Sequence, residues 1–138
     1  MARKNTKKTT KKKIIDKYDP QIYPRQLWVS KNVTMSDVCK RFSNRDDSEL
    51  DKSWDPTEGT FTLCVKDKQT GKYGLLVNFA DWALGDKSKL INYVTHEAEH
   101  VKSSIFDDIG LITNPDSQEA DAYLIGWIAQ CIYETITK

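Results

Sequence analysis

The chain has 138 residues, of which 38% are hydrophobic and 30% are charged, and its net charge is +1 at pH 7. This length suits one domain with its own core, and no apolar run approaches the roughly 18 residues of a membrane span, so a membrane protein is not expected. The start of the chain is basic, but neither an apolar stretch nor a small-residue cleavage site follows it, which is unlike a secretory signal. We therefore expect a cytoplasmic protein.

Charge is unevenly distributed along the chain. The first 17 residues contain eight lysine or arginine residues and one acid, a net charge of +7, so the rest of the chain carries −6. A segment rich in lysine, threonine and asparagine has nothing to bury, so we expect a disordered basic tail over residues 1–13 and a single domain over residues 14–138. The tail either makes weak contacts with nucleic acid through its phosphates or only increases solubility.

The sequence of the first half of the domain predicts little regular structure. A short strand is predicted at residues 27–29, after two prolines that keep the chain extended. Residues 34–42 predict a short helix with Thr34 or Ser36 as its N-cap. The stretch 43–58 is dense in Asp, Ser, Asn and Pro, and it predicts a long surface loop.

A β-hairpin is the clearest strand signal. Residues 60–66 and 73–79 are both rich in β-forming residues, and the polar turn between them contains Gly71, which suits the positive φ of a bulged hairpin. Strand alternation leads us to expect the larger apolar side chains of both strands on one face of the sheet, packed on a core. These side chains are Phe61, Leu63, Val65, Leu75, Val77 and Phe79.

Two helices are predicted to cover that face. Asp86 or Ser88 can cap a helix whose apolar residues recur every three or four positions up to Gly110. A second helix is predicted from residues 114–117 to the end of the chain. The expected fold is therefore α+β, with a small antiparallel sheet of about three strands, including the hairpin, packed on two C-terminal helices.

The spacing of the three cysteines does not indicate a disulfide framework. Cys39, Cys64 and Cys131 are odd in number and far apart, and no CxxC spacing occurs. We expect reduced thiols in a reducing compartment rather than disulfides.

The two histidines of the chain lie in one motif, His96-Glu97-Ala98-Glu99-His100. Four-residue spacing on a helix stacks both imidazoles on one face, away from the apolar stripe, with Glu97 beside them. This is the HExxH arrangement of zinc sites. Two histidines alone do not hold catalytic zinc well, because such sites use three protein ligands and one open position. Glu119 follows His100 by nineteen residues, in the first turn of the next predicted helix.

This combination resembles the small gluzincin-type zinc metallopeptidase domains called minigluzincins, and the segment 119–127 also resembles phage-encoded HExxH proteins of unassigned function. The resemblance covers about residues 60–138. It implies a zincin-like domain in which His96, His100 and Glu119 bind Zn²⁺ and Glu97 is the general base. It also implies that a peptide or protein substrate pairs with the strand before the motif helix, here Tyr73 to Phe79.

Two departures from the family pattern concern catalysis. Gluzincins commonly carry an aspartate four residues after the ligand glutamate, and this chain has Tyr123 there. They also take a histidine or tyrosine from a second lobe to stabilise the oxyanion. In this chain, Tyr93, Tyr123 or a residue of the 43–58 loop could substitute, so Tyr123 is a second catalytic candidate.

Other interpretations of the same residues stay open. The two histidines could be surface residues that pair with Glu97 or Glu119, and Glu119 could be an ordinary first-turn acid favoured by the helix dipole. The sequence therefore predicts a zinc-dependent hydrolase that best matches a small metallopeptidase. The alternative is a non-catalytic zinc-binding or interaction module of phage or mobile-element origin, which contacts protein or nucleic acid.

Overall fold

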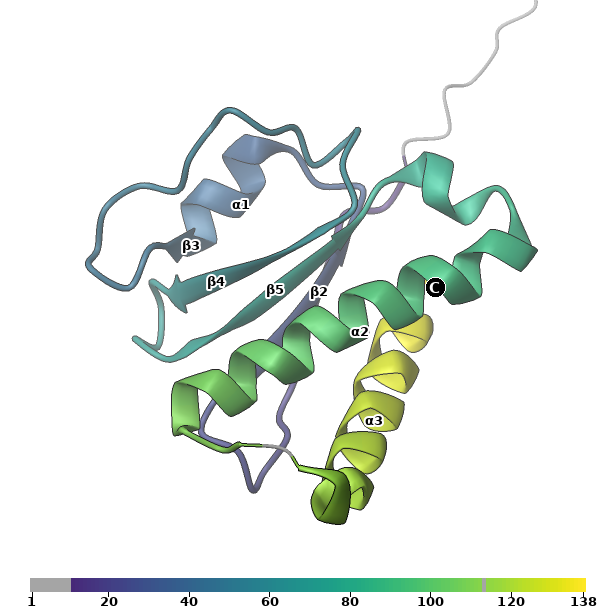
Figure 1. Cartoon of the computed structure of the whole chain (residues 1–138). Helices are drawn as coiled ribbons and strands as arrows, with labels where there is room; N and C mark the ends of the chain where they lie inside the picture. Colours follow the sequence, from purple (N-terminus) through teal and green to yellow (C-terminus); the bar gives the residue numbers. More distant parts are fainter. Residues whose placement is uncertain (1–10, 113) are drawn as a thin grey trace, which may run out of the picture.

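The computed structural model describes residues 11–112 and 114–138, and it shows an α+β fold in which one mixed sheet lies between helices (Figure 1). The two C-terminal helices pack on one face of the sheet, as predicted, and a shorter helix covers the other face. The strands are β1 (Ile14–Tyr18), β2 (Gln26–Lys31), β3 (Phe42–Ser43), β4 (Phe61–Asp67) and β5 (Tyr73–Phe79). The helices are α1 (Met35–Arg41), α2 (Lys87–Ile109) and α3 (Gln118–Ile136), with short 3-10 turns η1 (Asp81–Leu84) and η2 (Pro115–Ser117).

The sheet is larger than the sequence predicted, with five strands in the order β1-β2-β5-β4-β3. Its one parallel pair is β2 with β5, and the other neighbouring strands are antiparallel. The pairing of β2 with β5 joins strands that lie far apart in the sequence, which local patterns cannot reveal. Of the helices in the described ranges, none combines the length and the apolar character needed to cross a membrane.

The sequence determines the ends of α2 directly. The carboxylate of Asp86 accepts hydrogen bonds from the backbone N–H groups of Ser88 and Lys89, which would otherwise lack partners in the first turn. The helix ends at Gly110, whose φ of 70° is in the left-handed region that glycine adopts without strain. Both predicted ends are therefore confirmed.

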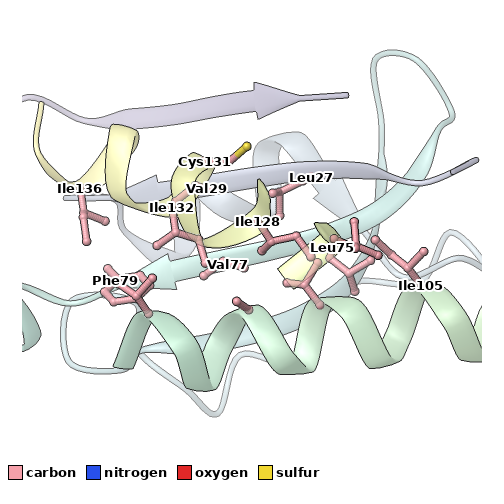
Figure 2. Close-up of a cluster of buried hydrophobic side chains, with 14 of the residues drawn as sticks. Leu27, Val29, Leu75, Val77, Phe79, Ile105, Ile128, Cys131, Ile132 and Ile136 are labelled. Atoms are coloured by element: carbon pink, nitrogen blue, oxygen red, sulfur yellow. The ribbon is translucent and has the colours of Figure 1, made fainter. Parts of the chain in front are cut away.

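The two strands of the hairpin bury their apolar residues on opposite faces, so the prediction of one shared face was wrong. In the register, Leu63 lies opposite Leu76 and Cys64 opposite Leu75, and residues directly opposite share a face. Val65 and Leu76 thus pack in the cluster under α1. The side chains of Leu75, Val77 and Phe79 instead face α2 and α3, together with Leu27 and Val29 of β2 (Figure 2).

This register places the small side chains of β4, not its large ones, beneath α2. Thr62 and Cys64 lie on the same face of the sheet as Val77 and Leu75, their partners in β5. Room is therefore left between β4 and α2.

An ion-pair cluster anchors the C-terminal end of α2. Arg25 Nε donates to Asp108 Oδ2 at 2.9 Å, and Arg45 contacts both oxygen atoms of the same carboxylate. Arg25 and Arg45 also lie 5.9 and 5.3 Å from the centroid of the Tyr73 ring. The side chain of Asp108 is 17% exposed, so solvent screens these contacts only partly. Asp108 therefore links α2 to the segment before β2 and to the long loop.

We expect Asp108→Asn to lower the free energy of unfolding by about 1–3 kcal/mol at pH 7, because two arginines lose their charged acceptor. The hydrogen bond from Arg45 lowers the pKa of Asp108, burial opposes this, and Arg25 lowers it further. The contribution of Asp108 is therefore complete above the unfolded-state pKa of about 3.9 and is lost as the pH falls through the lower folded-state value.

Urea unfolding at pH 7 and pH 3 measures this effect, with Asp107→Asn as the matched control because Asp107 is exposed. The difference between wild type and Asp108→Asn should shrink at pH 3. An equal effect of both substitutions at pH 7 would contradict the anchoring role.

Candidate metal centre

The two histidines lie on the exposed face of α2 with their side chains directed at each other. His96 Nε2 and His100 Nε2 are 3.0 Å apart, and the ring centroids are separated by 4.7 Å in an edge-on arrangement. Residues four apart on a helix are neighbours on its surface, and the apolar stripe of α2 turns this face outward. The two nitrogen atoms can share a proton or point their lone pairs at a common cation.

The spacing of the two nitrogen atoms fits a metal ion. Zinc binds imidazole nitrogen at about 2.0–2.1 Å in tetrahedral geometry, which places two such ligand atoms about 3.3 Å apart. The 3.0 Å separation of the His96 and His100 nitrogens is close to this value. A small rotation of either ring is enough to reach it.

Glu97 points away from solvent, towards the sheet. It is 5% exposed, and its Oε2 accepts a 2.5 Å hydrogen bond from Thr62 Oγ1 of β4. A hydrogen bond to a carboxylate offsets part of the cost of removing the charge from water. The second carboxylate oxygen, Oε1, makes no hydrogen bond to another described residue. Glu97 is therefore fixed through one oxygen atom, and the other is available.

The histidines and Glu97 line one pocket of about 300 Å³ between α2 and β4. The two elements run in the same direction, as the arrow of β4 and the colours along α2 show in Figure 1. The pocket is lined by Thr60, Phe61, Thr62, Cys64, Leu75, His96, Glu97, His100 and Ser104.

The sequence did not indicate that the small residues Thr60, Thr62, Cys64 and Ser104 line this pocket. Ser104 lies on α2, four residues after His100. For Thr60, Thr62 and Cys64, the signal was the alternation along residues 60–64, in which small side chains occupy every second position. That signal is ambiguous without the hairpin register, which decides which face turns towards α2.

The structure does not bring Glu119 to the histidines. Glu119 is exposed in the first turn of α3, and among residues 11–112 and 114–138 no three His, Cys, Asp or Glu side chains lie close enough to hold a metal ion. The acid of α3 that faces α2 is Asp121, whose Oδ1 lies 3.3 Å from Lys102 Nζ. Lys102 also binds Glu99 at 2.9 Å, and this hydrogen bond lowers the pKa of the Glu99 carboxyl.

The tyrosine candidates lie outside the pocket. Tyr123 is 76% exposed and lines a separate depression with Tyr23 and Trp127. The ring of Tyr93 packs edge-on against Trp82, at 5.4 Å between centroids. No residue of the 43–58 loop lines the pocket either. The geometry therefore brings none of the sequence candidates for oxyanion stabilisation to the histidines.

The strand suggested for peptide binding is an interior strand. Residues 73–79 form β5, which pairs with β2 on one side and β4 on the other, so its backbone has no free edge for a peptide. The open edge next to the pocket belongs to β4. The short strand β3 pairs there only with Lys66 and Asp67, and no described strand pairs with the outer edge of residues 61–65. This corrects the position of peptide pairing, while the peptide itself stays a prediction.

Comparison of the chain with protein-family models, with curated proteins and with solved structures gave no match. Only the residues of the chain itself therefore bear on a metal centre. These are two histidines with converging nitrogen atoms and a buried glutamate in the same pocket.

We expect Thr62→Val to lower the free energy of unfolding by about 1–3 kcal/mol at pH 7, because it leaves the buried Glu97 carboxylate without its hydroxyl donor. Chemical denaturation measures the change, and Thr62→Ser, which keeps the hydroxyl donor, is the matched control. A double-mutant cycle with Glu97→Gln should show coupling between residues 62 and 97. Additive effects of the two substitutions would contradict this pairing.

Proposed function

We propose that the protein is a zinc-dependent hydrolase of the metallopeptidase class, in which His96 and His100 bind zinc and Glu97 is the general base. The observation that carries this proposal is the 3.0 Å separation of the two Nε2 atoms. It is supported by Glu97, which lines the same pocket and has one carboxylate oxygen available.

Glu119 is the proposed third ligand. It is an exposed carboxylate at the start of the helix that packs beside α2, and no hydrogen bond or ion pair joins it to another described residue. It can therefore be recruited without breaking an existing contact, whereas Asp121 is held by Lys102. A movement of Glu119 towards the histidines is part of the proposal.

Zinc and the residues of the pocket would have separate roles in peptide hydrolysis. Bound zinc would supply an acidic water and polarise a substrate carbonyl. Thr62 holds Oε2 of Glu97, so that Oε1 accepts the proton of the attacking water and returns it to the leaving amine. No geometry supports a role for Tyr123 in this reaction, and the proposal assigns it none.

The proposed substrate is a peptide in extended conformation on the outer edge of β4. An open strand edge binds such a peptide by main-chain hydrogen bonds, and residues 61–65 offer one beside the pocket. The proposed location is the cytoplasm, which is supported by the three cysteines, since all of them are free thiols.

A non-catalytic zinc-binding module is the second candidate. It is favoured by the burial of Glu97 and by its hydrogen bond to Thr62, which would equally serve to hold α2 against β4. Both candidates bind zinc, so only an activity measurement separates them.

We expect the wild-type protein, stripped with a chelator and reloaded, to bind one equivalent of zinc. His96→Ala should abolish stoichiometric binding, and Glu119→Ala should weaken it more than about tenfold, because each substitution removes a ligand. Glu134→Ala, an exposed glutamate on the same helix as Glu119, is the matched control. Titration calorimetry and elemental analysis measure the binding. Full zinc retention by His96→Ala would contradict the zinc site. Full zinc retention by Glu119→Ala would contradict only the role of Glu119 as third ligand.

For catalysis, we expect zinc-loaded Glu97→Gln to keep its metal and to cleave a mixed peptide library at least about 100-fold more slowly than wild type, because the base is lost. Mass spectrometry of the digested library measures the rate. Glu99→Gln is the control, since Glu99 is bound to Lys102. A zinc-loaded wild-type protein that cleaves nothing in the library would favour the non-catalytic module.

A further inference from the structure

A second pocket, of about 500 Å³, lies between the β1–β2 connection and the first half of α3. We call it the aromatic pocket, because three aromatic side chains line it. It shares no residue with the pocket of the two histidines. Its volume is in the range of about 300–1,000 Å³ that small-molecule sites occupy. The lining residues are Asp19, Pro20, Gln21, Ile22, Tyr23, Ala120, Tyr123, Leu124 and Trp127.

The aromatic rings of the pocket are those of Tyr23, Tyr123 and Trp127. The Tyr23 ring lies 5.8 Å from the ring of Phe106, and both Tyr23 and Trp127 pack against the core cluster beneath α2 and α3. These two rings are therefore held in place, whereas Tyr123 is 76% exposed at the rim. The face of an aromatic ring carries negative electrostatic potential, so the three rings favour a positively charged ligand.

Asp19 is the only charged residue that lines the aromatic pocket. Its Oδ1 accepts a 2.8 Å hydrogen bond from the backbone N–H of Gln21, and it forms no ion pair with another described residue. No lysine or arginine lines the pocket, so a bound cation would meet a carboxylate and no like charge among the lining residues. The carboxylate and the rings therefore favour the same sign of ligand charge.

The wall of the pocket contains a strained turn. Gln21 has a φ of 56°, in the left-handed region that costs a residue other than glycine about 1–2 kcal/mol. The hydrogen bond from its N–H to Asp19 offsets part of this cost. Ile22, the next residue, is 83% exposed at the rim. Asp19 therefore both holds the turn and supplies the charge of the pocket.

The adjoining pocket limits the charge of a ligand. It shares Asp19, Gln21 and Tyr23 with the aromatic pocket, and it is also lined by Arg25 and Lys72. A second positive charge that extended along the groove would approach these two cations. A ligand with one positive charge avoids this repulsion.

We propose that the aromatic pocket binds a small organic cation with a single methylated ammonium group. The methyl groups spread the charge over a surface that contacts several rings at once, and such a group needs no hydrogen-bond acceptor for each of its substituents. The proposal gives Tyr123 a role that the histidine pocket does not give it. It does not depend on zinc.

Titration of the full chain with choline at constant ionic strength tests the proposal, with the NMR signal of the Trp127 indole N–H as the readout. Choline should shift this signal saturably, with a Kd of about millimolar order. The neutral isostere 3,3-dimethylbutan-1-ol has the same shape without the charge, and it should bind at least about tenfold more weakly.

Two variants identify the residues that carry the binding. Tyr123→Ala should weaken choline binding about two- to fivefold, whereas Tyr133→Ala, an exposed tyrosine on the same helix outside the pocket, should leave it unchanged. Asp19→Asn keeps an oxygen acceptor for the Gln21 N–H but removes the charge, and it should weaken binding about two- to fivefold. Glu134→Gln is its control, an exposed acid of α3 outside the pocket.

Four results would overturn the proposal. The first is no saturable shift up to about 50 mM choline. The second is equal affinity for choline and its neutral isostere, which would show a merely apolar pocket. The third is an equal loss of affinity in Tyr123→Ala and Tyr133→Ala. The fourth is binding of a peptide that contains trimethyllysine without binding of choline, which would assign the pocket to a protein partner. His96→Ala should bind choline as wild type does, so failure of the zinc proposal leaves this one intact.

Discussion

The packing of α2 on the sheet is the constraint on which the candidate site depends. Its buried stripe of Val94, Ala98, Val101 and Ile105 fixes the rotation of the helix about its axis. Once that rotation is set, His96 and His100 must face outward, and Glu97 falls at the boundary between solvent and sheet. The packing that buries the apolar stripe of α2 therefore also determines the direction of the proposed metal ligands.

The hairpin register completes the site from the other side. It turns Thr62 and Cys64 of β4 towards α2, and these small side chains leave a pocket where larger ones would fill the space. The hydroxyl group of Thr62 then satisfies the only carboxylate that α2 buries. A helix motif becomes a site here because a strand supplies a cavity and a hydrogen bond in the right place.

Local signals predicted the elements of this fold better than their assembly. The cap at Asp86, the left-handed Gly110 and the hairpin turn at Gly71 each depend on a few adjacent residues, and each was predicted. The parallel pairing of β2 with β5 depends on residues about fifty positions apart. The same limit applies to the site, since the histidine spacing on α2 could be predicted whereas the distance of Glu119 from it could not.

The central claim is that His96 and His100 form a zinc site, and a crystal structure of zinc-loaded protein with data collected on both sides of the zinc absorption edge tests it most directly. We predict an anomalous difference peak at about 2.0–2.1 Å from Nε2 of both histidines, with a carboxylate of Glu119 as a further ligand. Histidine rings that remain hydrogen-bonded to each other, with no anomalous peak between them at full zinc loading, would contradict the account.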